Sequence, residues 1–104
     1  MKRRGKDMTI EKTVNGNDAT LKIEGWLDSQ SAPLLGQALG ELGKEVKHLV
    51  LDLGGLEYIS SAGIRQIIAA YKQMNGELTL HNVNVEVQDV LMTTGIAKKL
   101  HIEP

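Results

Sequence analysis

The chain of 104 residues contains no cysteine and no phenylalanine. The absence of cysteine excludes disulfide bonds, thiolate metal sites and a cysteine nucleophile. Because aromatic residues make up only 3% of the sequence, the core has to consist of aliphatic side chains and methionine. No segment approaches the roughly 18 consecutive apolar residues of a membrane-spanning helix, and the start of the chain lacks the apolar stretch of a signal peptide. We therefore expect a cytoplasmic protein that does not insert into a membrane.

The chain also lacks a strong excess of charge of either sign, with a formal net charge of -1. Without a large positive field, the domain has no general attraction for nucleic acid, and we expect no nucleic-acid partner. The exception is the segment 1–7, MKRRGKD, which carries four positive charges and one negative charge. Such a terminus either contacts phosphates or lipid head groups or is simply solvated. We expect residues 1–7 to form a flexible basic arm, followed by one domain over residues 8–104.

The remaining sequence alternates between segments typical of strands and segments typical of helices. Alternating apolar residues at 8–14 and 19–23 flank Asn15-Gly16, which predicts an antiparallel hairpin. The nearly continuous apolar run HLVLDL at 48–53 is typical of a central strand that is covered on both faces and ends near Leu53. Helical spacing of apolar residues follows both the hairpin and this run, and a further strand and short helix come after them. The order predicts a single α/β domain with a mostly parallel sheet of four to five strands, an N-terminal antiparallel hairpin, and helices packed on the sheet.

The first predicted helix has recognisable signals at both ends. Ser31 is expected to cap its start, with Pro33 in the first turn, and Gly43 is expected just after its end. Gly36 and Gly40 lie four residues apart within it. They either permit close packing or only weaken the helix.

The segment LEYISSAGIRQI at 56–67 places two serines at the expected start of the second helix. A helix N-terminus carries about half a positive charge and several unpaired N–H groups. The helix would therefore tolerate a phosphate on Ser60 or Ser61, and the added charge of about -1.5 to -2 would act on a docked partner instead. The alternative is plain capping, since serine is one of the commonest N-cap residues.

Four stretches of the sequence, in this order and spacing, resemble the STAS family, whose archetypes are the bacterial anti-sigma factor antagonists. They are IEGWLDSQSAPLL, HLVLDLGGLEYISSAGIRQIIAAYKQM, GELTLHNVN and VQDVLMTTGIAKKLHI, and the resemblance extends over most of residues 8–102. It implies that ISSAG is the switch loop, in which Ser61 matches the serine that a partner kinase phosphorylates. Ser60 stands where the family often has aspartate, and it is the alternative acceptor.

The resemblance further implies the function of an anti-sigma factor antagonist. The unphosphorylated chain would bind an anti-sigma factor that is also a serine kinase, phosphorylation would end the complex, and a phosphatase would restore binding. The free chain is expected to be a monomer. The alternative is a non-catalytic STAS scaffold subunit of a lipid-transport or stress-signalling complex. The residues expected to contact the partner are Asp28, Glu57, Ser60, Ser61, Ala62, Gly63, Arg65, Gln66 and Ala69.

One of these residues, Asp28, has a second interpretation as a turn or capping carboxylate ahead of the first helix. No residue pattern indicates catalysis. A serine nucleophile needs a base within reach, but His48, His81 and His101 are far apart in the sequence and have no clustered carboxylates beside them. A metal-binding spacing and a Walker-type phosphate loop are also missing. We therefore expect no enzyme activity, no metal and no cofactor.

Overall fold

The computed structural model describes residues 8–95 and 98–103, and the predicted basic arm at 1–7 lies outside these residues. Within them the chain forms five strands and three α-helices. Their bounds are β1 Thr9–Asn15, β2 Asp18–Leu27, α1 Ala32–Gly40, β3 His48–Ile59, α2 Ser61–Gln73, β4 Leu78–His81, α3 Val85–Thr93 and β5 His101–Ile102.

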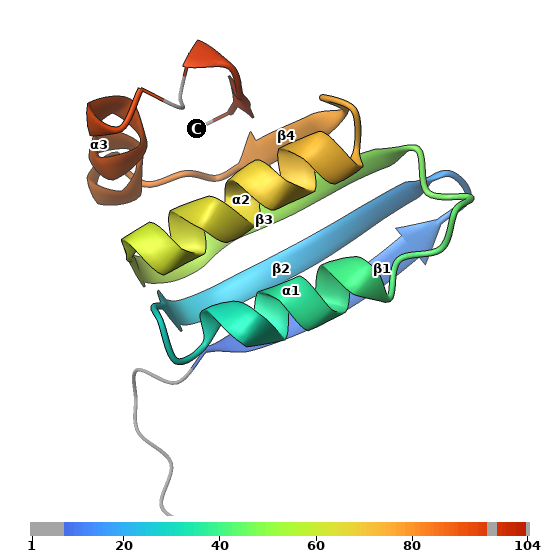
Figure 1. Ribbon diagram of the computed structural model, residues 1–104, viewed down its shortest axis with the longest axis horizontal. Helices are drawn as coiled ribbons and strands as arrows, with labels where there is room; N and C mark the ends of the chain where they lie inside the picture. Colours follow the sequence, from blue (N-terminus) through green and yellow to red (C-terminus); the bar gives the residue numbers. More distant parts are fainter. Residues whose placement is uncertain (1–7, 96–97, 104) are drawn as a thin grey trace, which may run out of the picture.

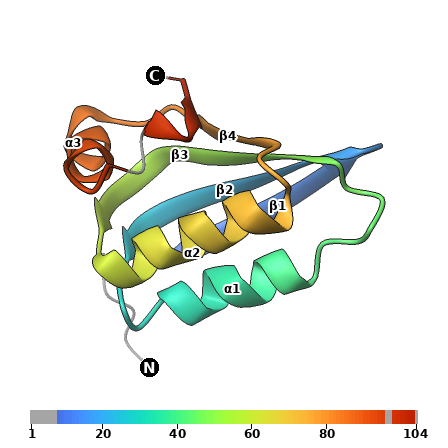
Figure 2. The ribbon, with the colours of Figure 1, turned by 45° about the horizontal axis from the view of Figure 1, so that its top comes forward.

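All five strands belong to one sheet, in the spatial order β1-β2-β3-β4-β5. β1 and β2 are antiparallel, and the other neighbouring strands are parallel. α1 and α2 lie side by side on one face of the sheet, whereas α3 lies at the end of the sheet where β3 terminates (Figure 1, Figure 2). The predicted α/β fold, with its antiparallel hairpin and otherwise parallel strands, is confirmed.

The core lies between the sheet and the two helices that cover it, and it is aliphatic as the composition requires. No polar or charged side chain is buried among the described residues. A core without buried polar groups loses no free energy to unsatisfied hydrogen bonds. The largest fully buried side chains are all leucine or isoleucine: Leu21, Ile23, Leu27, Leu35, Leu49, Leu51, Leu53, Leu56, Ile67, Leu78, Leu80 and Leu91.

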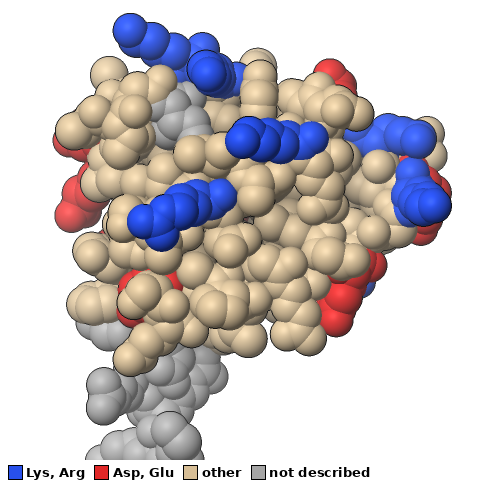
Figure 3. Space-filling view, in the orientation of Figure 1, with Lys and Arg blue, Asp and Glu red and all other residues tan. Residues whose placement is uncertain are grey.

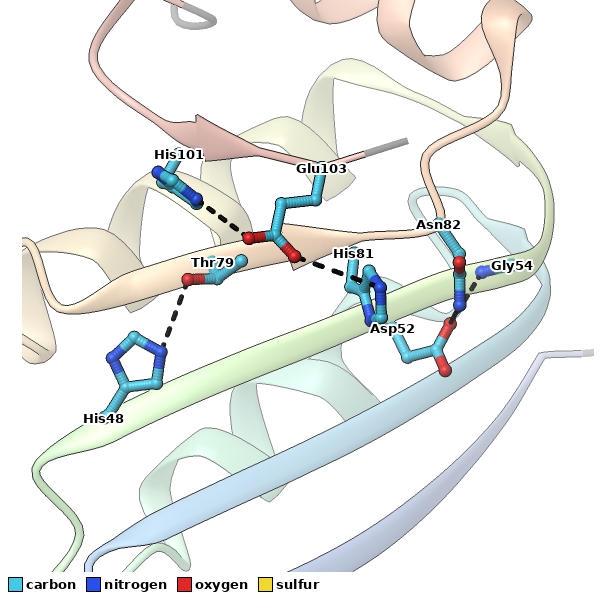
Figure 4. Close-up of polar contacts among 8 residues, drawn as sticks. All are labelled: His48, Asp52, Gly54, Thr79, His81, Asn82, His101 and Glu103. Carbon is cyan, nitrogen blue, oxygen red and sulfur yellow. Dashed lines mark hydrogen bonds and ion pairs between the residues drawn. The ribbon is translucent and has the colours of Figure 1, made fainter.

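The prediction that residues 48–53 are covered on both faces is wrong. Leu49 and Leu51 are fully buried, but the intervening Val50 and Asp52 are only half-buried. Successive side chains of a strand point to opposite faces, and α1 and α2 cover one face only (Figure 2). The opposite face carries polar contacts instead, among them the hydrogen bonds that Asp52 accepts (Figure 4).

β3 also continues to Ile59 rather than ending near Leu53. The pairing of β2 with β3 shifts in register between Lys22 and Glu24, and again between Gly25 and Trp26. Such irregularities are places where glycine is favoured in a strand. A Cβ atom on Gly55 would lie 2.6 Å from Cγ of Glu24. Gly54 and Gly55 therefore accommodate the register shift instead of ending β3.

α1 differs from the prediction at both ends. It stops at Gly40 with Glu41 as its C-cap, so Gly43 does not end it. Ser31 occupies the N-cap position, but its side chain makes no capping hydrogen bond. Of the two glycines within α1, only Gly36 has a packing role, because a Cβ atom there would lie 3.1 Å from Oε1 of Gln66 on α2, whereas Gly40 has no such neighbour within 4 Å.

Candidate functional site

The candidate site lies at the edge of the sheet where β2 and β3 end. Because the two strands are parallel neighbours, the loops that follow them emerge at the same edge. Leu27 and Ile59 form the last pair of the register, and the backbone N–H of Ser60 donates to the carbonyl oxygen of Leu27 at 2.9 Å. The fold thus brings Asp28 and the two serines together, although about thirty residues separate them in the sequence.

The two serines divide the roles that the sequence left open. Ser60 is the N-cap of α2: its backbone is extended, and its hydroxyl oxygen accepts a hydrogen bond from the backbone N–H of Gly63 at 3.4 Å. Ser61 is the first helical residue and is exposed. Capping is therefore carried by Ser60, and the hydroxyl of Ser61 makes no hydrogen bond to another described residue.

The surroundings of Ser61 favour a negative group. The first turn of α2 contains no acidic residue, and the helix N-terminus contributes a partial positive charge there. Arg65 lies one turn further along and is exposed, at the i+4 spacing that allows side chains on one helix face to interact. Along its own helix, a phosphate on Ser61 would therefore meet attraction rather than repulsion.

Asp28 is held in a closed set of hydrogen bonds with the loop that it begins. Its carboxylate accepts from the backbone N–H groups of Gln30 and Ser31, both at 3.0 Å, and from the Ser31 hydroxyl at 3.1 Å. The N–H of Ser31 is the main reason that the pKa of Asp28 lies below its ordinary value. The Ser31 hydroxyl lies 2.7 Å from the Trp26 carbonyl, and its oxygen accepts from the backbone N–H of Asp28 at 2.9 Å, so the side chain is directed into this loop and does not accept from the N–H groups of α1. This geometry supports the turn interpretation of Asp28.

Gly63 is buried at the junction of the two loops. A Cβ atom on it would lie 2.6 Å from Cγ of Leu27 and 2.9 Å from the Leu27 carbonyl oxygen. Only glycine lets the start of α2 approach the end of β2 this closely. Gly63 therefore positions Ser61 and is not itself accessible.

The other residues predicted to contact a partner differ in exposure. Glu57, Arg65 and Ala69 are exposed, whereas Ala62 and Gln66 are half-buried, with Gln66 against Gly36 of α1. Glu57 belongs to β3 and not to a loop. The exposed residues of the predicted set are therefore Glu57, Ser61, Arg65 and Ala69, and the others are less accessible.

Two further features at this edge have no clear signal in the sequence. Trp26 and Tyr58 are partners across the β2–β3 register, and their ring centroids are 5.0 Å apart. This pairing depends on the two register shifts in β2, which no local pattern predicts. The second feature, a groove between β3 and α3, comes from segments that only the sheet order brings together.

The three histidines lie on the open face of the sheet and contact partners there, not the serines (Figure 4). Nε2 of His101 is 3.0 Å from the Glu103 carboxylate, and His81 is 3.9 Å from the same group. His48 lies 3.3 Å from the Thr79 hydroxyl. Among the residues that the structure describes, no group of three or more histidine, aspartate or glutamate side chains is arranged to hold a metal ion. In the same part of the chain, each helix is too short or too polar to cross a bilayer.

Comparisons with known proteins agree with this geometry. A model of the STAS domain family matches residues 9–104. The protein BtrV of Bordetella bronchiseptica, named as an anti-sigma factor antagonist, is 36% identical over 77 residues, which cover 70% of this chain and 66% of that protein.

Solved structures extend the likeness to the whole fold. An anti-sigma factor antagonist from Mycobacterium paratuberculosis superposes with a TM-score of 0.86 at 22% identity, covering 97% of this chain and 89% of that chain. The anti-sigma factor antagonist SpoIIAA is known in two forms. The unphosphorylated form has a TM-score of 0.75 at 15% identity, covering 92% of this chain and 87% of that chain. The phosphorylated form, from Bacillus, has a TM-score of 0.62 at 16% identity, covering 92% of this chain and 90% of that chain.

Proposed function

Because the chain belongs to the STAS domain family and is of the anti-sigma factor antagonist type, we propose that it binds an anti-sigma factor kinase and is released by phosphorylation of Ser61. Antagonists of this type are non-catalytic regulators, which agrees with the expectation of no enzyme activity. The partner uses ATP to phosphorylate the chain, and a phosphatase restores the binding form. The chain acts in the cytoplasm and is a monomer when free.

The observation that carries the choice of Ser61 is the division of labour between the two serines. Ser60 is half-buried and its hydroxyl caps α2, whereas the hydroxyl of Ser61 is exposed at the helix start. A kinase needs an accessible hydroxyl, and a phosphate at the first helical position is favoured by the helix dipole. Phosphorylation of Ser60 would instead modify the oxygen that accepts the hydrogen bond from the Gly63 N–H, and it would disturb the cap of α2.

The physical effect of the phosphate is on the complex and not on the fold. A group with a charge of about -1.5 to -2 replaces a neutral hydroxyl at a surface that a partner covers. In a tight interface, repulsion and desolvation of such a group cost several kcal/mol, since buried unpaired charge is strongly unfavourable. The helix start tolerates the same group, so the domain stays folded while the complex dissociates.

The test is phosphorylation by the cognate anti-sigma factor kinase with magnesium and ATP, followed by intact-mass measurement. We expect a gain of one phosphate on the wild-type chain. Trypsin cleaves after Lys47 and Arg65, so one peptide, 48–65, contains both serines, and fragmentation within it has to localise the phosphate. Ser61→Ala should abolish the gain, and the matched control Ser60→Ala should retain it.

Two results would contradict the proposal. A mass gain that persists in Ser61→Ala would move the acceptor elsewhere, with Ser60 as the first candidate. A wild-type chain that neither binds the anti-sigma factor nor accepts phosphate would favour a STAS scaffold subunit in a larger complex.

A further inference from the structure

A groove opens immediately beside the candidate switch site. It has a volume of about 220 Å³ and lies between the last residues of β3 and one side of α3. Ile59 forms part of it and directly precedes Ser60, so the groove is continuous with the edge that carries Ser61. The residues lining the groove are Glu57, Tyr58, Ile59, Glu86, Val87 and Val90.

The floor of the groove is apolar and the exposed parts of its walls are partly apolar. Ile59 and Val87 are buried, whereas Tyr58 is 44% exposed and Val90 is 37% exposed. An apolar floor with an accessible aromatic ring is typical of the pocket that receives an anchoring side chain in a protein interface. The size of the groove suits a single aliphatic side chain better than a large cofactor.

The described charged residues that line the groove are of one sign. Both of these residues are glutamates, Glu57 and Glu86. Neither of the segments 48–64 and 73–97 contains a lysine or arginine. Figure 3 shows acidic side chains at the left-hand end of the molecule, where α3 lies, and also along the right-hand side, whereas lysine and arginine lie over α2 and at the upper and right-hand edges. An acidic segment would be repelled here, and a basic one attracted.

The walls of the groove are fixed to each other. The side-chain amide of Asn84 donates to the carbonyl of Leu56 on β3 at 2.8 Å. The Asn84 carbonyl oxygen accepts from the backbone N–H of Val87 at 2.8 Å and so caps α3. One side chain thus joins the start of α3 to β3, and a preformed groove costs less ordering when a partner binds.

The geometry points to this groove as a second docking site for the partner of Ser61, occupied by a segment in which lysine or arginine flanks an aliphatic side chain. The inference rests on the proposed function, because the occupant is assigned to the anti-sigma factor kinase. The aliphatic side chain lies against Ile59, Val87 and Val90. A basic group pairs with Glu86 on the α3 side of the groove. The partner therefore meets the chain at two adjacent points, of which phosphorylation changes only one.

The first test uses a peptide probe on the full, unphosphorylated chain, followed by amide chemical shifts in NMR. The probe is an acetylated and amidated peptide of alternating lysine and leucine, and its control has glutamate in place of lysine. We expect the basic peptide to shift amides along 57–59 and 86–90, and the acidic peptide to leave them unchanged. Equal shifts with both peptides, or shifts centred elsewhere, would overturn the assignment of a basic occupant.

The second test measures phosphorylation kinetics with the anti-sigma factor kinase. Glu86→Gln and Val90→Ala should each raise the KM for the chain about fivefold while kcat stays within about twofold, as for loss of a contact at an interface. Each variant has a matched control on α3 outside the groove. These controls, Asp89→Asn and Val85→Ala, remove the same charge and the same side-chain atoms, and they should leave KM unchanged. Circular dichroism checks that all four variants keep the fold.

The two tests separate the failure of this inference from the failure of the proposed function. If wild type is phosphorylated on Ser61 and the groove variants have the KM of wild type, the second docking site is wrong and the proposed function stands. If wild type is not phosphorylated and does not bind the kinase, the assignment of the occupant to that partner is wrong as well. Similar losses in the groove variants and their controls would also overturn the inference, because they would indicate a general effect on α3.

Discussion

The two loops at the edge of the sheet, β2–α1 and β3–α2, use serine side chains in opposite ways. In the β2–α1 loop, the backbone N–H of Asp28 donates to the Ser31 hydroxyl, and the Asp28 carboxylate accepts from the backbone N–H of Ser31. The Ser31 hydroxyl in turn lies 2.7 Å from the Trp26 carbonyl. In the β3–α2 loop, only one side-chain hydrogen bond is present among the described residues, from the Gly63 N–H to Ser60. One loop is closed on itself, and the other leaves Ser61 available.

The difference indicates how a small domain combines rigidity with a modifiable group. The closed loop forms a fixed support, because its polar groups already have partners. The open loop rests on that support through the Ser60 N–H and the close contact of Gly63 with Leu27. Exposure of Ser61 therefore does not require flexibility of the site. Substitutions in either loop can remove the contrast between the closed and the open loop or measure its size.

The largest expected effect is on partner affinity when the open loop receives a charge. Ser61→Asp should weaken binding to the anti-sigma factor by about a hundredfold, because a carboxylate at the interface is repelled and poorly solvated. The urea midpoint should be unchanged or slightly higher, since an acidic residue in the first turn of a helix is favourable. Binding is measured by calorimetry and stability by urea unfolding.

The control for this prediction is Ser61→Asn, which has nearly the same size without the charge. It should lose far less affinity than Ser61→Asp. Equal losses in the two variants would mean that bulk, and not charge, disrupts the complex.

A smaller effect is expected from separating the two loops. Gly63→Ala places a Cβ atom against the Leu27 side chain and carbonyl, and overpacking of this kind should destabilise the domain by about 2.5 kcal/mol. Gly40→Ala is the matched control, because Gly40 has no neighbour within 4 Å of the added atom. It should stabilise the domain, by up to about 1 kcal/mol, through higher helix propensity. Urea unfolding of both variants checks the contrast, and similar changes in the two would contradict it.

Removal of the hydroxyl should reduce stability by different amounts at Ser31 and Ser60, the N-cap positions of α1 and α2. Ser31→Ala removes the hydroxyl that lies against the Trp26 carbonyl and accepts from the Asp28 N–H in a partly buried loop, which should cost about 2 kcal/mol. Ser60→Ala removes one cap, which should cost about 1 kcal/mol. A larger loss in Ser60→Ala than in Ser31→Ala, measured by urea unfolding, would reverse the assignment of closed and open loops.

The local parts of this architecture could be predicted from the sequence. Asn15-Gly16 marks the hairpin turn, and the serine pair before Ile64 marks the start of α2, because turns and helix caps depend on residues close together in the chain. The resemblance of ISSAG to a switch loop then selects Ser61 over its neighbour. Ser61 is exposed, as a phosphate acceptor has to be, and its phosphorylation stays a prediction.

The parts that depend on distant residues could not be predicted in the same way. The extension of β3 past Gly54-Gly55 requires register shifts in β2, and the open face of β3 depends on where the helices pack. The closure of Asp28 onto Ser31 depends on the direction of the Ser31 side chain. The Ser-x-Pro spacing alone predicts that this side chain caps α1 instead. The groove beside Ser61 requires α3 to return to β3, which only the sheet order determines.

The smallest predicted effect concerns the charge of Asp28 in the closed loop. Hydrogen bonds from the backbone N–H of Ser31, from the Ser31 hydroxyl and from the backbone N–H of Gln30 lower the pKa of Asp28 in the folded state. A lowered folded pKa gives stability that is present above the unfolded pKa, about 3.9, and is lost as the pH falls through the folded value. Asp28→Asn keeps an oxygen that accepts the same hydrogen bonds and removes only the charge.

The variant should therefore be less stable than wild type at neutral pH, and the difference in urea midpoint should shrink towards zero as the pH falls below about 4. Asp52, whose pKa is also lowered, is present in both proteins, so its titration cancels in the difference. Glu11→Gln on β1 is the control, because Glu11 accepts no side-chain hydrogen bond from the described residues. A wild-type advantage over Asp28→Asn that stays constant to about pH 2.5 would mean that the loop is closed by shape and not by the carboxylate charge.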